Sequence, residues 1–394
     1  MGFASGSVSF RRFLVVGKHP KEITQEMLDK LAEFALKVGE FSVPDEVEYG
    51  WCGGRHVFDG HFSFEHNVFN EALNFALRID TNRVPGELKK AYQLMEEDAA
   101  AANNPSGHIS KKQKKDVKDI VRQKVEEDLK SGKFRRSKLV PILWDFPTQT
   151  LYTPGSNSVV EKLHELFERT FGLNLEPLSA GTVALRHLEE IKKRREYEDA
   201  RPTRFVSGPE GEGQMPEYPW TAQGPQPKDF LGNEFLLWLW HHIETQGGTI
   251  KVEGAEDMGL VIDQTLELDC AYGQTGKDAL KGDGPTRMPE ARDGLRSGKL
   301  PRKAGLILET GGKQYQFKFN CETFGCGSTV LPEVEEAEDA RVLFEERIVM
   351  LRDLAKGIDT LFHTFLKTRA SSAWEGQVNT IRQWITRPSK QAAA

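Results

Sequence analysis

A segment rich in proline and glycine lies near the middle of the chain and limits the folds that the sequence can adopt. Residues 201–228 contain six prolines and four glycines, and this density excludes a long helix or a central strand. We interpret the segment as a linker or a long surface loop. A chain of 394 residues is longer than a single hydrophobic core usually supports. We therefore expect two or three structural units rather than one.

The composition fits a water-soluble globular protein. Hydrophobic residues make up 38% and charged residues 28% of the chain, so the core has to come from amphipathic elements. No run approaches the roughly 18 apolar residues that a membrane span requires. The N-terminal residues lack the pattern of a secretory signal, and Gly6 stands where a myristoylation motif needs Ser or Thr. Four scattered cysteines without a CxxC pair suit a reducing cytosol, so we expect a cytoplasmic protein with free thiols.

Hydrophobic periodicity predicts strands followed by helices in the first half of the chain. The β-branched and aromatic residues of 8–16 predict a strand, and the segment after Pro20 has apolar residues at helical spacing. Residues 51–80 predict short strands of a sheet, interrupted by glycines. Two further short strands and an amphipathic helix are predicted within 139–171, and they repeat the strand-then-helix order of the N-terminus.

The second half alternates predicted helices with glycine-rich or charged stretches. Residues 230–244 predict a short helix that is buried on nearly all sides. The polar segment 273–303 resembles a long insertion, and we expect a helix within it at 289–297. A β-hairpin is predicted around the glycine pair at 311–312. Residues 335–368 predict a last helix with one apolar stripe.

The strongest functional signal is a basic segment, residues 111–138, in a chain whose formal net charge is −6. It holds twelve basic and five acidic residues, a net charge of +7, so the rest of the chain carries −13. Such segregation is typical of proteins that bind a polyanion. At about 100° per residue, five cations share one helix face within roughly 100°, a geometry suited to a phosphate backbone. These five are Lys111, Lys114, Lys115, Lys118 and Arg122.

The residues after this predicted helix add an aromatic side chain to the basic group. In the stretch GKFRR, Phe134 lies among cations, which is the setting of a residue that wedges between bases or stacks on them. Two simpler interpretations stay open: a lysine-rich helix face that is only solvated, and a phenylalanine that is buried for packing. The candidate DNA-binding residues after the helix are Lys133, Phe134, Arg135, Arg136 and Lys138.

A second group of cations near residue 300 is a candidate for an additional DNA contact. Residues 287–303 contain six basic and two acidic residues, a net charge of +4. A third basic group, within 186–195, is diluted by glutamates and is more typical of an exposed helix. We assign the secondary contact to Arg296, Lys299, Arg302 and Lys303.

The sequence offers little support for catalysis or for a metal site. It lacks HExxH, GxSxG and GxxxxGK[ST]. The three histidines within 56–66 recur every five residues, which fits neither one helix face nor one strand face. Asp145 with Glu165 or Asp80 would suit a nuclease only if the carboxylates converged on a metal. We therefore predict a binding protein with no catalytic residue, no metal and no cofactor.

The order of several segments resembles a known family. These segments are FRRFLVV near the start, GWCGG near residue 51, RIDTNRVPGELKKAY, KKQKKDVKDIVRQKV, ILWDF, VEKLHELFERTFGLNLEPLS, and ARDGLRSGKLPRKAGLIL before a hairpin. In this collinear order they resemble the bacterial recombination-associated RdgC family. The resemblance covers most of residues 8–200 and, more thinly, 230–330.

The resemblance implies a DNA-binding protein without catalytic activity. Members of that family form a ring-shaped homodimer whose positively lined hole encircles duplex DNA, and they limit RecA-dependent recombination and support replication. A nucleoid-associated, cytoplasmic protein is therefore expected, with double-stranded DNA and a second copy as partners. The stretch KFRRSK is similar to the family segment that reaches toward DNA, so the resemblance favours Phe134, Arg135 and Arg136 as contacts.

The implied fold is α+β, with two related central sheet-and-helix units, a basic helical tip and a C-terminal base that mediates dimerisation. The chain is longer than typical members because of the segments near 201–228 and 273–300 and an extended C-terminus. The expected divisions are 1–82 and 139–200 as the two central units, 83–138 as the basic tip, 201–228 as a linker or insertion, 229–332 as the base with its polar insertion, and 333–394 as a C-terminal helical extension.

Two other classes of function compete with DNA binding. One is a metal-dependent nuclease built on a related fold, for which Asp145 is the first candidate ligand. The other is a protein-interaction scaffold whose acidic C-terminal helix docks a partner. DNA cleavage with magnesium that Asp145→Asn abolishes would favour the nuclease, and partner binding that survives neutralisation of Lys114, Lys118 and Arg122 would favour the scaffold.

Overall fold

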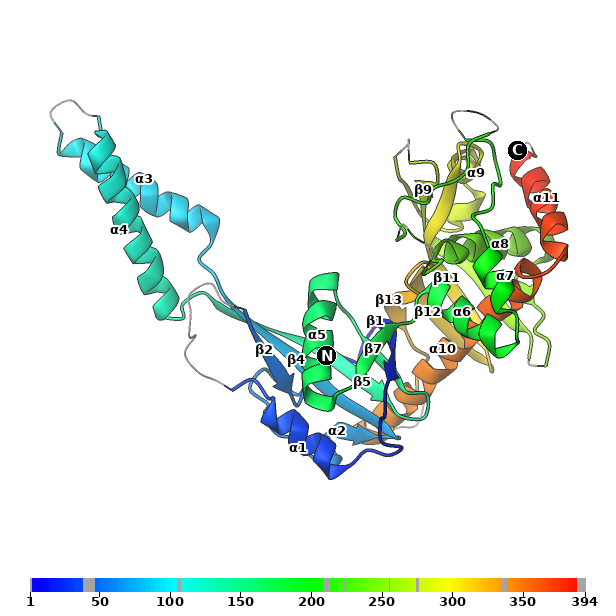
Figure 1. The fold of residues 1–394 in the computed structure, drawn as a ribbon, viewed down its shortest axis with the longest axis horizontal. Coiled ribbons are helices and arrows are strands. Elements are labelled where there is room, and N and C mark those ends of the chain that lie inside the picture. Colours follow the sequence, from blue (N-terminus) through cyan, green and yellow to red (C-terminus); the bar gives the residue numbers. More distant parts are fainter. Residues whose placement is uncertain are drawn as a thin grey trace.

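A computed structural model of the chain describes residues 2–37, 47–104, 108–208, 211, 213–222, 224, 226–254, 256–273, 276–334 and 339–387. The architecture is mixed α+β, with a large antiparallel sheet that runs through the body and a helical hairpin that projects from it (Figure 1). The predicted α+β class is confirmed at this level.

Thirteen strands in the described ranges form the sheet, and every pairing between them is antiparallel. Their main order is β10-β9-β11-β12-β13-β1-β6-β5-β4-β2. In addition, β3 pairs with β4, β7 with β1 and β8 with β9. The strands are β1 (Val8–Val16), β2 (Val47–Cys52), β3 (Val68–Phe69), β4 (Ala72–Asn82), β5 (Arg135–Asp145), β6 (Thr150–Thr153), β7 (Asn174–Pro177), β8 (Thr249–Ile250), β9 (Met258–Cys270), β10 (Asp278–Lys281), β11 (Lys299–Thr310), β12 (Lys313–Asn320) and β13 (Gly325–Val330).

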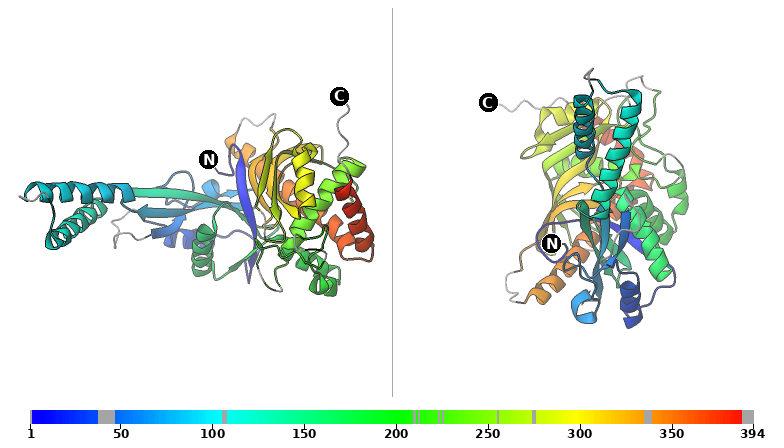
Figure 2. Two further views of the ribbon diagram at one scale, coloured as in Figure 1. Left: turned by 90° about the horizontal axis from the view of Figure 1, so that it is seen from above. Right: turned by 90° about the vertical axis from the view of Figure 1, so that its left-hand side faces the viewer.

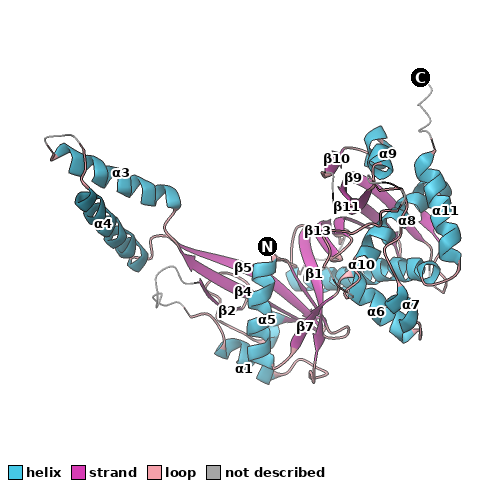
Figure 3. Ribbon diagram, turned by 45° about the horizontal axis from the view of Figure 1, so that its top comes forward, coloured by secondary structure: helices cyan, strands magenta, loops and turns pink. Residues whose placement is uncertain are grey.

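Helices flank both halves of the sheet (Figure 3). The first half is flanked by α1 and α5, and the second half by α6, α8, α10 and α11. The helices are α1 (Gln25–Glu33), α2 (Phe64–Asn67), α3 (Gly86–Ala102), α4 (Lys111–Lys130), α5 (Asn157–Phe171), α6 (Ala180–Glu190), α7 (Arg194–Asp199), α8 (Phe230–Gln246), α9 (Pro289–Arg296), α10 (Ala340–Arg369) and α11 (Ala373–Thr386), with a short 3-10 helix η1 at Pro285–Arg287.

Strand β1 joins the two halves of the sheet. Its first residues pair with β13, where Val8 lies opposite Thr329, and its later residues pair with β6 on one edge and β7 on the other. The segments 1–82 and 139–200 contribute strands to the same half, because β4 and β5 pair along their whole length. The two expected central units therefore share one continuous sheet.

Two hydrophobic cores lie against this sheet. The first packs α1 and α5 on β1, β4 and β5 around side chains such as Leu31, Trp144 and Phe167. The second surrounds α8, whose residues from Phe230 to His241 are all buried. This confirms the prediction of a helix buried on nearly all sides. Gly232 is required there, because a Cβ at this position would lie 1.9 Å from the carbonyl oxygen of Cys321.

Several C-terminal elements differ from the expectation. The segment 273–303 is not one long insertion: it contains β10, η1, α9 and the start of β11. Residues after 333, expected as a C-terminal helical extension, include the helices α10 and α11, which pack into the second core with α8. The hairpin of β11 and β12 and the helix α9 agree with the prediction. Residues 201–208, 213–222 and 226–228 contain no helix or strand, as expected of a linker or loop.

Candidate nucleic-acid interface

The basic segment lies on an arm that extends away from the body. Strands β4 and β5 form an uninterrupted ribbon of eleven residue pairs, from Ala72 opposite Asp145 to Asn82 opposite Arg135. Helices α3 and α4 continue from the far end of this ribbon, and Figures 1 and 2 show them projecting well beyond the rest of the chain. The two sides of this arm are therefore open to a large ligand.

The helical hairpin of the arm is held mainly by polar contacts. Helix α3 has no buried residue, and α4 buries only Val117 and Leu129. The hydroxyl of Tyr92 donates to Asp128 at 2.6 Å, and Lys124 pairs with Glu96 at 2.6 Å. The side-chain amide of Asn82 donates to the carbonyl of Leu129 at 2.7 Å. This last bond fixes the end of α4 to the ribbon.

Helix α4 starts with positive charge where most helices prefer negative charge. Ser110 and Gln113 form a capping box that satisfies the first backbone N–H groups. Lys111 and Lys112 follow at once, and no acidic residue occurs in the first turn. The helix dipole disfavours cations there and favours an anion. The arrangement weakens the helix and strengthens its attraction for phosphate.

The predicted lysine face is exposed. Lys111, Lys114, Lys115 and Lys118 are exposed and form no ion pair with any described residue. The fifth member, Arg122, is also exposed but pairs with Asp119 at 3.1 Å. We call the first four residues the lysine strip. Two cations that the helical-face argument omitted, Lys112 and Lys130, are exposed beside it, about 60° round the helix from Lys115.

The residues of KFRRSK are divided between exposed and engaged positions. Lys133 lies 3.7 Å from Asp128 and 5.4 Å from the ring of Phe134, which is half-buried. Arg135 pairs with the buried Asp80 at 2.7 Å. Arg136 and Lys138 are exposed and lie two residues apart on β5, so they share one face of the strand. The exposed cations Arg136 and Lys138 are thus better placed for an external ligand than Arg135.

The engagement of Arg135 belongs to a buried charge cluster at the base of the arm. Asp80 accepts hydrogen bonds from both Arg78 and Arg135. Burial alone would raise the pKa of Asp80, but these bonds and one from Ser137 outweigh it and lower that pKa. The guanidinium of Arg78 lies 5.4 Å from the ring of Phe58. Sequence reasoning missed this cluster because Asp80 and Arg135 lie 55 residues apart.

The structure does not join the secondary basic group to the lysine strip. Arg296 donates to the carbonyls of Ile385 and Arg387, and so fastens the end of α11. Arg302 pairs with Asp269 and Glu322. Lys299 pairs with Asp278 at 2.7 Å, and Lys303 with Glu267 at 3.0 Å. These four cations serve contacts within the body, so we leave them out of the interface.

The carboxylates considered for a nuclease do not converge. Asp145 is buried and accepts from Arg352 at 2.8 Å and from Thr148 at 2.5 Å. Asp80 is occupied by two arginines, and Glu165 lies on α5 on the other face of the sheet. Within the described ranges, no group of three or more His, Cys, Asp or Glu side chains could hold a metal ion. The rings of His61 and His66 meet edge to face at 5.6 Å, without a third ligand.

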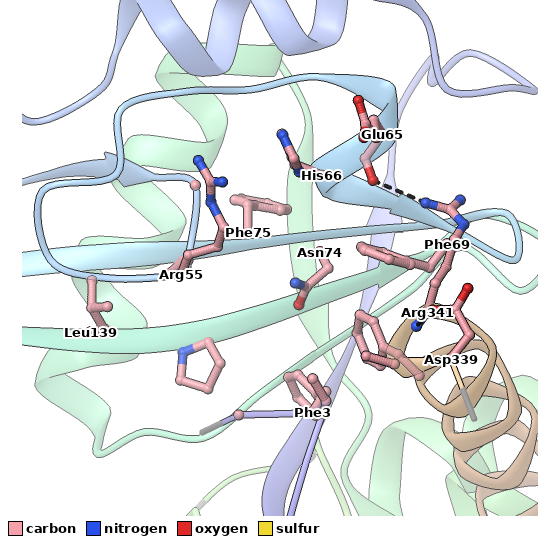
Figure 4. A pocket seen from close by; sticks show the side chains of 18 residues that line it. Phe3, Arg55, Glu65, His66, Phe69, Asn74, Phe75, Leu139, Asp339 and Arg341 are labelled. Atoms are coloured by element: carbon pink, nitrogen blue, oxygen red, sulfur yellow. Dashed lines mark hydrogen bonds between the residues drawn. The ribbon is translucent and has the colours of Figure 1, made fainter. Parts of the chain in front are cut away.

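The cavity of Figure 4 lies where β4 and β5 meet the start of α10, and its volume is about 580 Å³. Three of its charged side chains already have partners. Arg55 forms two hydrogen bonds with Asp59, and Arg341 donates to the carbonyls of Glu65 and Val68. Asp339 caps α10 by accepting from the backbone of Arg341. Glu65 and His66 also line the cavity, and the ring of His66 contacts that of His61.

Comparison with known proteins leaves the site as the main guide to function. No protein-family model and no curated protein matches this chain. None of the helices in the described ranges is long and apolar enough to cross a membrane. The four cysteines form no disulfide and are all buried.

Proposed function

We propose that this protein binds double-stranded DNA without sequence specificity, through the arm. The observation that carries the proposal is the lysine strip: exposed ammonium groups without carboxylate partners among the described residues, at the positive end of a 20-residue helix. Such groups release counterions when they meet phosphates, which gives affinity that does not depend on base sequence. The exposed Arg136 and Lys138 extend the same charge along the ribbon.

The proposed assembly is a homodimer that encircles DNA. It rests on the resemblance of the segment order to the RdgC family, and the projecting arm is compatible with a protomer that wraps part of a duplex (Figure 2). In this proposal the protein limits access of RecA recombinase by occupying DNA, and it is associated with the nucleoid. It performs no catalysis. Sedimentation should find a species of twice the chain mass, and a monomer at all concentrations would contradict the dimer.

The test of DNA binding is a salt series on a duplex of arbitrary sequence. The variant Lys114→Ala, Lys115→Ala, Lys118→Ala removes three charges that have no described ion pair. Each lost phosphate contact lowers the salt slope of the binding constant by about 0.9, so the triple variant should lose two to three units of slope. Fluorescence anisotropy with labelled DNA measures both affinity and slope.

The matched control removes three exposed lysines from the body. Lys251, Lys281 and Lys318 are exposed and form no ion pair with described residues, so their substitution by alanine changes the net charge equally. This control should keep the parent's slope. Equal slopes for the parent and the arm variant would show that the strip is only a solvated helix face and would refute the proposal. Magnesium-dependent cleavage lost in Asp145→Asn would instead favour the nuclease.

A further inference from the structure

A second site lies far from the arm, under the proline-rich loop. A cavity of about 430 Å³ opens between the end of α7 and the start of α8. In Figure 1 these helices lie at the end of the molecule opposite α3 and α4. Its lining includes Glu198, Arg201, Glu217, Tyr218, Lys228 and Phe230.

Lys228 places a charged group in the wall of this cavity. The residue is only 7% exposed, and its ammonium donates to the carbonyl oxygens of Glu198 at 2.7 Å and Ala200 at 2.8 Å. It forms no ion pair with any described carboxylate. Burial lowers the pKa of Lys228, and the nearby Arg201 and Arg369 lower it further, while Asp199 and Glu198 partly offset this. A buried ammonium with only neutral partners is costly.

The backbone around Lys228 is fixed in place before any ligand arrives. A Cβ on Gly181 would lie 2.3 Å from the amide nitrogen of Lys228, so only glycine allows α6 to approach this closely. The next residue, Asp229, accepts a hydrogen bond from the amide of Gly181 at 2.9 Å. The amide of Lys228 donates to the hydroxyl of Tyr197 at 3.2 Å. The ammonium therefore has little freedom to leave for solvent.

A second cation lines the same cavity. Arg201 donates to the same two carbonyls, of Glu198 at 3.0 Å and Ala200 at 3.1 Å, and forms no ion pair with a described residue. Its neighbour Arg369 is not available in the same way, because Arg369 pairs with Glu234 at 2.6 Å. Lys228 and Arg201 thus converge on one edge of the cavity without a carboxylate between them.

The remaining walls are aromatic or already engaged. Tyr218 and Phe230 are buried, with ring centroids 5.8 Å apart. The hydroxyl of Tyr218 has no hydrogen-bond partner among the described residues. Two carboxylates also line the cavity: that of Glu198 is bound to Arg194 at 2.9 Å, and that of Glu217 lies on an exposed residue. An apolar wall facing two convergent cations is typical of a small-molecule site.

We infer that this cavity binds a small organic anion, with a carboxylate or phosphate head held by Lys228 and Arg201 and an apolar body against Tyr218 and Phe230. The anion would supply the negative charge that the buried ammonium lacks, because its hydrogen-bond partners are neutral carbonyls. Charge-assisted hydrogen bonds to both cations would hold the head. This inference does not depend on DNA binding.

The test is calorimetric titration of the full chain with phenyl phosphate and, separately, with benzoate. These probes distinguish the two head groups on the same ring, and benzyl alcohol is the neutral counterpart. We expect saturable binding of at least one anion and none of the alcohol. Arg201→Gln and Lys228→Met should each weaken that binding by about tenfold, as loss of a charge-assisted hydrogen bond predicts.

Two controls keep the result specific. Lys251→Met removes an exposed lysine outside the cavity, and the lysine-strip triple variant removes charge from the arm; both should leave binding unchanged. Saturable binding that is insensitive to Arg201→Gln, or that is lost in the triple variant, would overturn the inference. So would the absence of saturable binding by both anions. If Lys228→Met does not fold, Arg201→Gln decides, because Arg201 is exposed.

Discussion

The arm and the second core of the body are held together by different interactions. Helix α4 buries two side chains over 20 residues, whereas α10 buries twelve over 30. Around α10 the rings of Phe235, Phe324, Phe362 and Phe365 form a continuous aromatic cluster. The sequence of the body is therefore constrained by packing, and the sequence of the arm by the charge that it presents to solvent.

The same contrast holds for ion pairs. In the body, Arg12 of β1 is buried and donates two hydrogen bonds to Asp359 of α10, at 2.7 and 2.6 Å. On the arm, the pair of Arg122 and Asp119 is exposed on both sides. Buried pairs are strongly destabilising to break, while exposed pairs contribute little. Three predictions test this difference between the two regions.

The largest effect on stability is expected from truncating a side chain in the aromatic cluster. Phe362→Ala should lower the free energy of unfolding by about 3–5 kcal/mol, because it removes a fully buried ring and leaves a cavity. Leu94→Ala on α3, where the side chain is 60% exposed, should change it by less than about 0.5 kcal/mol. Urea denaturation measures both values. Similar losses for the two variants would remove the distinction between arm and body.

A smaller effect is expected from the buried ion pair. Asp359→Asn leaves the guanidinium of Arg12 buried without its counter-charge, and should cost about 2–4 kcal/mol after allowing for the partial exposure of Asp359. Asp119→Asn on the arm should cost less than about 1 kcal/mol. Thermal and urea unfolding of the two variants can be compared directly. An equal, small loss in both would mean that solvent screens the pair of Arg12 as well.

The smallest effect is a pH dependence confined to the body. The rings of His187 on α6 and His363 on α10 stack at 3.7 Å, 7° from parallel. Burial lowers both pKa values, and the neighbouring ring of His187 helps burial to lower the pKa of His363 to about 4. Asp359 and Glu190 partly offset this, while Arg12 and Lys367 add to it.

These directions fix the sign of the pH effect. A histidine with a lowered pKa binds protons less readily in the folded state than in the unfolded state. The contribution of these histidines to the free energy of unfolding should therefore be fully present above about pH 6.5 and should decline as the pH falls from there toward 4. His363→Gln should flatten that decline but leave the shares of His187, His164 and His241, whose pKa values burial also lowers, that of His241 to about 4. An unchanged slope in the variant would assign the decline to other groups. Helices α3 and α4 contain no histidine.

Local sequence patterns predicted individual helices and strands better than the pairing between strands. The strand at 8–16, the helix at 230–244 and the hairpin around 311–312 were visible because each depends on neighbouring residues. The sharing of one sheet by 1–82 and 139–200 was not visible, because it depends on pairing between β4 and β5 across a long insertion. Within 273–303 the helix α9 was predicted, but β10, η1 and the start of β11 were hidden by a polar, glycine-rich composition that is also typical of loops.

The candidate site shows the same limit. The exposure of Lys114 and Lys118 followed from helical periodicity alone. The pairing of Arg135 with Asp80 did not, because their contact joins two strands. The burial of Lys228 could not be predicted either, since a proline-rich stretch is ordinarily on the surface and the contact with α6 is formed through Gly181.

Strand β1 joins the two halves of the sheet, and this affects how the chain folds during synthesis. A ribosome delivers β1 before β5, β6 and β7, which follow within about 170 residues and build the first core around it. Its other neighbour, β13, comes roughly 320 residues after Val8. Until then part of one edge of β1 has no partner, and open strand edges are where nascent chains pair wrongly. The joint between the two halves closes last, so it is the point at which a growing polypeptide most needs shielding.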